Sequence, residues 1–189
     1  MLLVAACRSL AIPARVVGIR SWKLPPDAPA SARGFHQWIE IWDGGWRYLG
    51  AFDPGRVDVG WFADRAAATD PTVRRHRVHA AASVPTGLYF PLPWDAADRT
   101  VPALDVTPFY TRRRTVRVAV GAGQRFEIRH RGELVAAGRG PGAERPLAVG
   151  ERYDWRLLDD DGEELERGST TLAEGADELP LVASQSSRS

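Results

Sequence analysis

One stretch, residues 35–53, limits the possible folds of this chain more than any other. It begins FHQWIEIW, and successive side chains of such an extended segment point to opposite faces. One predicted face carries His36, Trp38, Glu40 and Trp42, and the other carries Gln37, Ile39 and Ile41. Asp43-Gly44-Gly45 is a strong turn signal, and residues 46–53 return as a second strand. The sequence therefore predicts a β-hairpin here.

The ends of this hairpin carry His36 and Asp53. A two-residue turn at Gly44-Gly45 places them directly opposite, with Cβ atoms about 4.5–5.5 Å apart. A turn at Asp43-Gly44 makes the pair diagonal but still within reach, whereas a three-residue loop separates the two side chains onto opposite faces. A carboxylate on one imidazole nitrogen leaves the other nitrogen free to act as a base. The alternative is a histidine at a strand end followed by an ordinary Asp-Pro-Gly turn.

The rest of the chain divides by pattern. Residues 2–10 predict a helix, 14–19 a short buried strand, 23–34 an exposed loop and 61–68 a helical segment. From residue 112 onward, short alternating strands separated by Gly- and Asp-rich turns are typical of a small all-β sandwich. We expect strands at 115–120, 125–129, 133–137, 152–157 and 164–170. The predicted domains are residues 1–69, a proline-containing connector over 70–111, a β-sandwich over 112–183 and a disordered tail over 184–189.

Composition excludes several classes of protein. Apolar residues make up 44% of the chain and charged residues 26%, which is typical of a folded domain with a core. The net charge of +1 gives no reason to expect a nucleic acid as partner, and no run reaches the length of a membrane span. Cys7 is the single cysteine, so an internal disulfide is impossible. MLLVAAC resembles a lipoprotein cleavage box but is too short for a signal peptide, and we interpret it as part of a helix.

Several short motifs, taken in order, resemble the transglutaminase-like superfamily of bacteria. They are IPARVVG (residues 12–18), HQWIE (36–40), Trp46 and the Phe-Asp-Pro of 52–54, followed by Trp61-Phe62 and the Val-Thr-x-x-Tyr string of 106–110. The resemblance covers about residues 2–61. It implies an α+β fold, with a papain/transglutaminase-like core of helix and antiparallel sheet. It also implies a Cys-His-Asp triad, in which His36 is the base and Asp53 the orienting carboxylate, and we expect Trp38 to line the substrate cleft.

Two departures from the family pattern stand out. Ala11 replaces the glycine that precedes Ile-Pro, which is a mild change. Cys7 lies only five residues before Ile12, whereas the family's nucleophilic cysteine begins its helix well over a dozen residues upstream. In the last turns of a helix the dipole opposes a thiolate, whereas at the first turn it favours one. We therefore expect Cys7 to be a helix-core residue and the nucleophile to lie upstream of Met1 or to be lost.

The resemblance implies acyl transfer from a polypeptide or peptide-like substrate through a thioester, to water or to an amine. No metal or organic cofactor is implied, and the compartment is not indicated. The chain as given is expected to be inactive. The alternative function is a non-catalytic binding or scaffolding protein that keeps the fold. We also expect that core left uncovered by a shortened helix can drive self-association.

Other features carry less weight. The arginine-rich runs at 74–77 and 112–114 are interpreted as solvated faces rather than phosphate contacts. His76, His79 and His130 lack the neighbouring ligands of a metal site. Asp159-Asp160-Asp161-Gly162 lacks the spaced ligands of a calcium loop and is interpreted as a hairpin turn. Most tryptophans are expected in the core rather than in a sugar-binding platform, namely Trp22, Trp42, Trp46, Trp61 and Trp94. Exposed tryptophans that line a cleft would instead suit a polymer substrate.

Overall fold

The computed structural model describes residues 2–23, 34–50, 56–92 and 97–181. The chain forms two compact units. The first contains residues 1–43 and 47–111, and the second contains residues 44–46 and 112–189.

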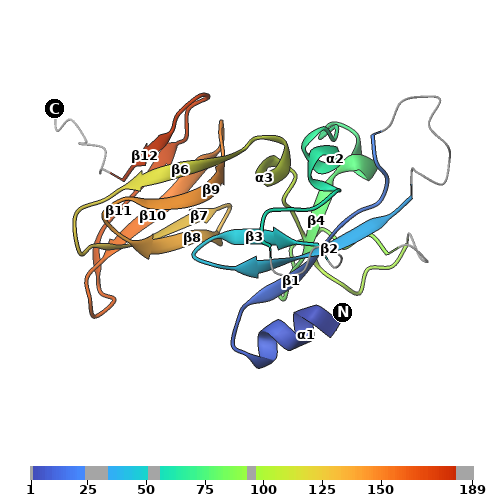
Figure 1. Ribbon diagram of the computed structural model, residues 1–189, viewed down its shortest axis with the longest axis horizontal. Helices are drawn as coiled ribbons and strands as arrows, with labels where there is room; N and C mark the ends of the chain where they lie inside the picture. Colours follow the sequence, from blue (N-terminus) through green and yellow to red (C-terminus); the bar gives the residue numbers. More distant parts are fainter. Residues whose placement is uncertain (1, 24–33, 51–55, 93–96, 182–189) are drawn as a thin grey trace. The chain divides into compact units, whose positions relative to one another are not determined.

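A five-stranded sheet forms the framework of the first unit, with strand order β3-β2-β1-β4-β5 (Figure 1). Its strands are β1 (Ala14–Ile19), β2 (His36–Trp42), β3 (Trp46–Leu49), β4 (Val78–Ala81) and β5 (Ala103–Asp105). The pairs β1–β2, β1–β4 and β4–β5 are antiparallel. The predicted strand over 14–19 is confirmed, and so is the predicted hairpin, since β2 and β3 are neighbours in the sheet.

Helix α1 (Leu2–Ser9) covers one face of this sheet. Val4 packs with Ala14 of β1 and Ile39 of β2, and Cys7 lies against this cluster. The helix ends in two backbone hydrogen bonds, from the N–H of Ala11 to the carbonyl of Arg8 and from the N–H of Ile12 to that of Cys7, both 3.0 Å. This is the Schellman pattern, whose C′ residue takes the left-handed conformation. Ala11 does so, with φ of 59°.

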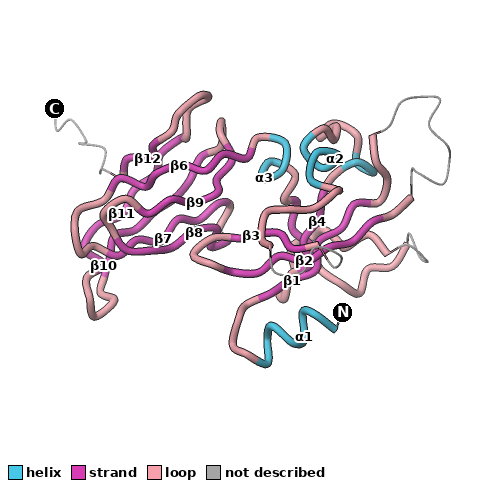
Figure 2. Tube along the Cα trace, viewed as in Figure 1, coloured by secondary structure: helices cyan, strands magenta, loops and turns pink. Residues whose placement is uncertain are grey.

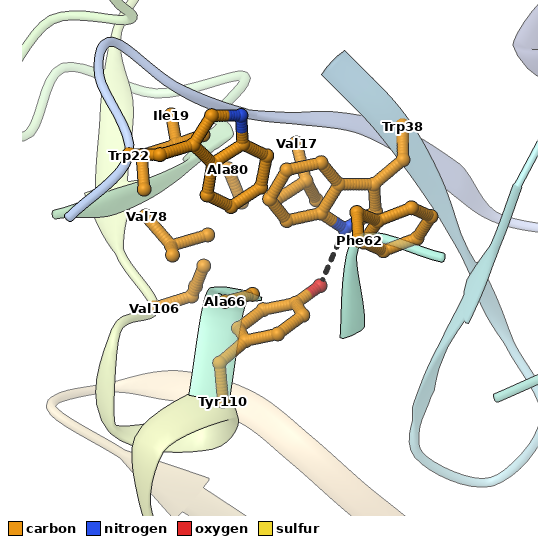
Figure 3. Close-up of a cluster of buried hydrophobic side chains, with 10 residues drawn as sticks. All are labelled: Val17, Ile19, Trp22, Trp38, Phe62, Ala66, Val78, Ala80, Val106 and Tyr110. Atoms are coloured by element: carbon orange, nitrogen blue, oxygen red, sulfur yellow. Dashed lines mark hydrogen bonds between the residues drawn. The ribbon is translucent and has the colours of Figure 1, made fainter. Parts of the chain in front are cut away.

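The opposite face of the sheet carries α2 (Ala63–Ala67) and α3 (Pro108–Thr111) (Figure 1). Figure 3 shows the core between these helices and the sheet, in which Phe62, Ala66 and Tyr110 pack on the strands. The strand residues of this core come from β1, β2 and β4; they are Val17, Ile19, Trp38, Val78 and Ala80. The predicted alternation of β2 is confirmed, because Trp38 faces this core while Ile39 faces α1.

Residues 70–111, predicted to be a connector, include part of the sheet. They contain the 3-10 turn η2 (Arg74–His76) in addition to β4, β5 and α3. The sequence signal failed because β4 and β5 have only four and three residues, too few for a visible alternation. Phe90 also packs closely on β1, since a Cβ at Gly18 would lie 2.8 Å from its ring.

The second unit contains two sheets (Figure 2). The four-stranded sheet has the order β11-β10-β7-β8, and the three-stranded sheet has the order β12-β6-β9. The strands are β6 (Arg113–Ala119), β7 (Arg125–His130), β8 (Glu133–Arg139), β9 (Ala143–Ala148), β10 (Arg152–Leu158), β11 (Glu164–Thr171) and β12 (Glu178–Pro180). All five predicted strands are found, within a few residues. β9 and β12 were not predicted.

In the second unit, apolar side chains from both sheets are buried, as in a small sandwich. Val116 and Val118 of β6 are buried, as are Phe126 and Ile128 of β7. Tyr153 of β10 joins the sheets, because its hydroxyl accepts a hydrogen bond from the N–H of Ala148 in β9 and donates one to the same residue's carbonyl. The β-rich fold with several antiparallel pairings is therefore confirmed.

Within the described residues, no helix has both the length and the apolar character that crossing a membrane requires.

Candidate functional site

His36 opens β2 on the face of the sheet that carries α2 and α3. It lies opposite Ile19 of β1 in the antiparallel register. Its half-buried imidazole is surrounded by aromatic rings, whose centroids lie 4.5 Å away for Trp61, 5.7 Å for Phe62, 5.8 Å for Trp22 and 5.9 Å for Trp38. A strand register and an aromatic cluster thus hold the ring from several sides.

This environment lowers the pKa of His36 from its usual value of 6.5. Burial among apolar rings is the larger cause, since it disfavours the charged imidazolium. The positive charge of Arg65 on α2 acts in the same direction. Near neutral pH the imidazole is therefore neutral and able to accept a proton, which a general base must be able to do.

Trp61 is the exposed member of this aromatic cluster. Its side chain is 53% exposed, and the guanidinium carbon of Arg65 lies 5.3 Å from its ring centroid. The prediction of a core position for Trp61 is wrong, while Trp22 is in the core as predicted. Trp42 and Trp46 are partly buried, and Trp94 lies outside the described residues.

Next to His36 along β2, a buried hydrogen-bond network joins three of the sequence motifs. The indole N–H of Trp38 donates to the Tyr110 hydroxyl at 2.8 Å, and this hydroxyl donates to Glu40 Oε1 at 2.6 Å (Figure 3 shows the first bond). Glu40 Oε2 accepts from Arg15 Nε at 2.7 Å, and Arg15 is the cross-strand neighbour of Glu40. Glu40 is 1% exposed, so this carboxylate and its partners fix β1, β2 and α3 together.

The network gives Trp38 a role that differs from the predicted one. Trp38 was expected to line a substrate cleft, but it is 3% exposed and packs between Trp22, Phe62 and Tyr110. The exposed tryptophan beside His36 is Trp61. Sequence reasoning missed this because a tryptophan just before a short helix carries no periodic signal of exposure.

Cys7 and Asp53 are the other two predicted residues of the triad. Cys7 packs with Val4, Ala14 and Ile39 on the α1 face of the sheet, whereas His36 contacts Trp38 and Phe62 on the other face. The sheet therefore separates the Cys7 thiol from the His36 imidazole. Asp53 lies outside the described residues, so its predicted position opposite His36 stays a prediction.

Comparison with known proteins gives one match. Residues 1–63 match the transglutaminase-like superfamily, and no curated protein or solved structure matches the chain. The resemblance inferred from the motifs is thereby confirmed over this N-terminal third of the chain. The match ends at Ala63, the first residue of α2.

The remaining candidate residues are the arginines of the two arginine-rich runs and the other three histidines. Arg112 and Arg114 form ion pairs with Glu151 and Asp177, and Arg77 lies 3.6 Å from Asp105. His130 contacts Glu151 at 2.8 Å. Burial lowers the pKa values of His76 and His79. The described residues contain no cluster of three or more metal-binding side chains.

The aspartate-rich run between β10 and β11 is a hairpin turn, as predicted. The N–H of Glu163 donates to Asp159 Oδ1 at 2.8 Å, and the N–H of Asp159 donates to the carbonyl of Glu163 at 3.0 Å.

Proposed function

We propose that the first unit has a papain/transglutaminase-like core. In this proposal it supplies the general base of a thiol acyl-transfer site, which is His36. The observation that supports this best is the half-buried imidazole of His36, which aromatic rings surround and whose pKa burial lowers, on a strand within the residues that match the superfamily. Asp53, which follows β3 in the chain, is the proposed orienting carboxylate.

The proposed reaction begins when the neutral His36 takes a proton from a cysteine thiol. The thiolate attacks an amide carbonyl of a polypeptide, the C–N bond breaks, and the imidazolium gives its proton to the leaving amine. The resulting thioester is resolved by water, giving a carboxylate, or by an amine, giving a new amide. Cys7 is not the proposed nucleophile, because it packs on the other face of the sheet from His36.

The test is expression of the whole reading frame that encodes this chain, including any codons upstream of Met1. We expect amide hydrolysis or amine incorporation that falls at least about 100-fold in His36→Ala, as for loss of a general base, and is unchanged in Cys7→Ser. Activity that is retained in His36→Ala would contradict the assignment of the base. Activity lost in a folded Cys7→Ser variant would identify Cys7 as the nucleophile.

The 189-residue chain by itself should show no thiol-dependent activity. Its Cys7 thiol is half-buried and packs against Val4, Ala14 and Ile39, on the other face of the sheet from His36. Iodoacetamide should therefore modify Cys7 in the folded protein more slowly than in the urea-unfolded protein. The rate should be equal in wild type and His36→Ala. Rapid labelling that depends on His36 would contradict this prediction.

The separation of Cys7 from His36 also favours a second candidate, a non-catalytic binding protein that keeps the fold. In that case the aromatic cluster around His36 holds a polypeptide without cleaving it. A whole reading frame that folds, binds peptides and turns over no amide or amine would support this candidate over the enzyme.

A further inference from the structure

Three side chains lie next to each other on the first unit, namely His36, Trp61 and Arg65. Trp61 is half exposed although it contacts buried rings, and it lies 4.5 Å from His36 and 5.3 Å from the guanidinium of Arg65, measured to the Trp61 ring centroid. An apolar ring left open to solvent beside a candidate base is typical of a surface that a ligand covers.

The segment that carries Trp61 is held in a fixed position. Asp58 has φ of 57°, in the left-handed region that Asp adopts more readily than most residues other than glycine. Its carboxylate accepts hydrogen bonds from Arg47 at 2.7 Å and from the N–H of Tyr48 at 3.2 Å. The Tyr48 hydroxyl also donates to the Asp58 carbonyl at 2.8 Å. The neighbouring Val57 and Val59 are left exposed, so the segment presents an apolar surface that leads to Trp61.

Arg65 adds a charge to this surface. It is exposed, and within the described part of the chain it forms no ion pair with a carboxylate; its guanidinium lies over the ring of Trp61. This differs from arginines such as Arg47 and Arg15, which are paired with carboxylates. A guanidinium that lies over an aromatic ring, with no carboxylate partner among the described residues, is well placed to bind a carboxylate of a ligand that also covers the ring.

We propose that Trp61 and Arg65 form a subsite for a peptide that carries a carboxylate side chain within two or three residues of the amide at His36. The apolar part of the peptide covers the Trp61 ring, and its carboxylate pairs with Arg65. Two or three residues of extended chain span the distance from His36 across Trp61 to Arg65. This inference rests on the proposed function for the role of His36, and it makes an acidic peptide the preferred substrate class.

The test is an NMR titration of the chain with two short peptides, acetyl-Ala-Glu-Leu-amide and acetyl-Ala-Gln-Leu-amide. The reporters are the indole N–H signal of Trp61 and the imidazole C–H signals of His36, identified by their loss in Trp61→Ala and His36→Gln. We expect the glutamate peptide to bind about threefold more tightly than the glutamine peptide, as for an exposed ion pair. Trp61→Ala should weaken both peptides about tenfold.

Arg65→Gln should remove the preference for the glutamate peptide. The matched control is Arg75→Gln, which removes one exposed arginine from η2 and should leave the preference intact. Equal binding of both peptides to the wild type would overturn the proposal. So would an equal effect of the two arginine variants, or no shift of either reporter at the solubility limit of the peptides. Peptide binding does not require catalysis. A protein expressed from the full reading frame that shows no activity would therefore overturn the proposed function and leave this binding result unchanged.

Discussion

At the scale of single residues, His36 carries the functional argument. Burial and Arg65 lower its pKa, and burial lowers those of His76 and His79 as well. A histidine whose pKa is lower in the folded state than when unfolded favours the neutral form on folding. The stability that this preference contributes is present above the unfolded pKa of about 6.5 and is lost as the pH falls through the folded value. The free energy of unfolding, measured in urea, should therefore fall as the pH is lowered below about 6.5.

The contribution of Arg65 to the lowered pKa of His36 can be measured separately by NMR titration of the histidines. In the wild type, the His36 signal should titrate below 6.5, and Arg65→Gln should raise its pKa toward that value, because the repelling charge is gone. His79 serves as the internal control, since Arg65 is not among the groups that shift its pKa. A His36 pKa at or above 6.5 in the wild type would contradict the neutral base assigned here.

Tyr110 is the residue on which the buried network depends. Replacement by Phe leaves the Trp38 indole N–H and Glu40 Oε1 without the hydroxyl that now joins them. We expect a loss of about 1–3 kcal/mol in the free energy of unfolding, because buried polar groups lose their partner. The matched control is Tyr89→Phe at an exposed ring, expected within about 0.5 kcal/mol of wild type. Equal effects in urea unfolding would show that the network does not stabilise the fold.

At the scale of elements, the end of α1 places Ala11 in the left-handed C′ position that favours glycine. The Cβ of Ala11 is strained there. Ala11→Gly should raise the free energy of unfolding by about 0.5–1 kcal/mol, since relief of that strain exceeds the entropy lost by glycine. Ala5→Gly, inside the same helix and exposed, should lower it by a similar amount. The opposite signs, measured by thermal or urea unfolding, distinguish backbone strain from a general effect of glycine.

The elements also show how far the sequence could predict this structure. Strands with clear alternation, such as β2 and β7, were found because their pattern needs no tertiary information, and β1 was found from its short β-branched run. β9 and β12 were missed because they contain Pro146 and Pro180, which argue against a strand. Both are edge strands of the three-stranded sheet, where proline is tolerated. Likewise, His36 could be identified from its motif, but the exposure of Trp61 depends on packing that no local pattern encodes.

At the scale of the whole molecule, the division into two units follows from where apolar surface is buried. In the first unit, both faces of the five-stranded sheet are used, one by α1 and the other by α2 and α3. In the second unit, two sheets bury their apolar faces, and the Tyr153 hydroxyl joins them. Each unit thus has a core built from its own strands, which is the usual condition for independent folding.

A fragment of residues 110–183 tests this independence. We expect a β-type circular dichroism spectrum and one cooperative unfolding transition, because the fragment contains all the strands β6 to β12 that enclose its core. About seventy residues are enough for a marginally stable domain without disulfides. Tyr153→Phe in the fragment should lower its stability by about 1–3 kcal/mol, since the buried N–H of Ala148 loses its acceptor. A fragment that stays unfolded would mean that the second unit requires residues from the first part of the chain, and that the protein folds as one cooperative domain.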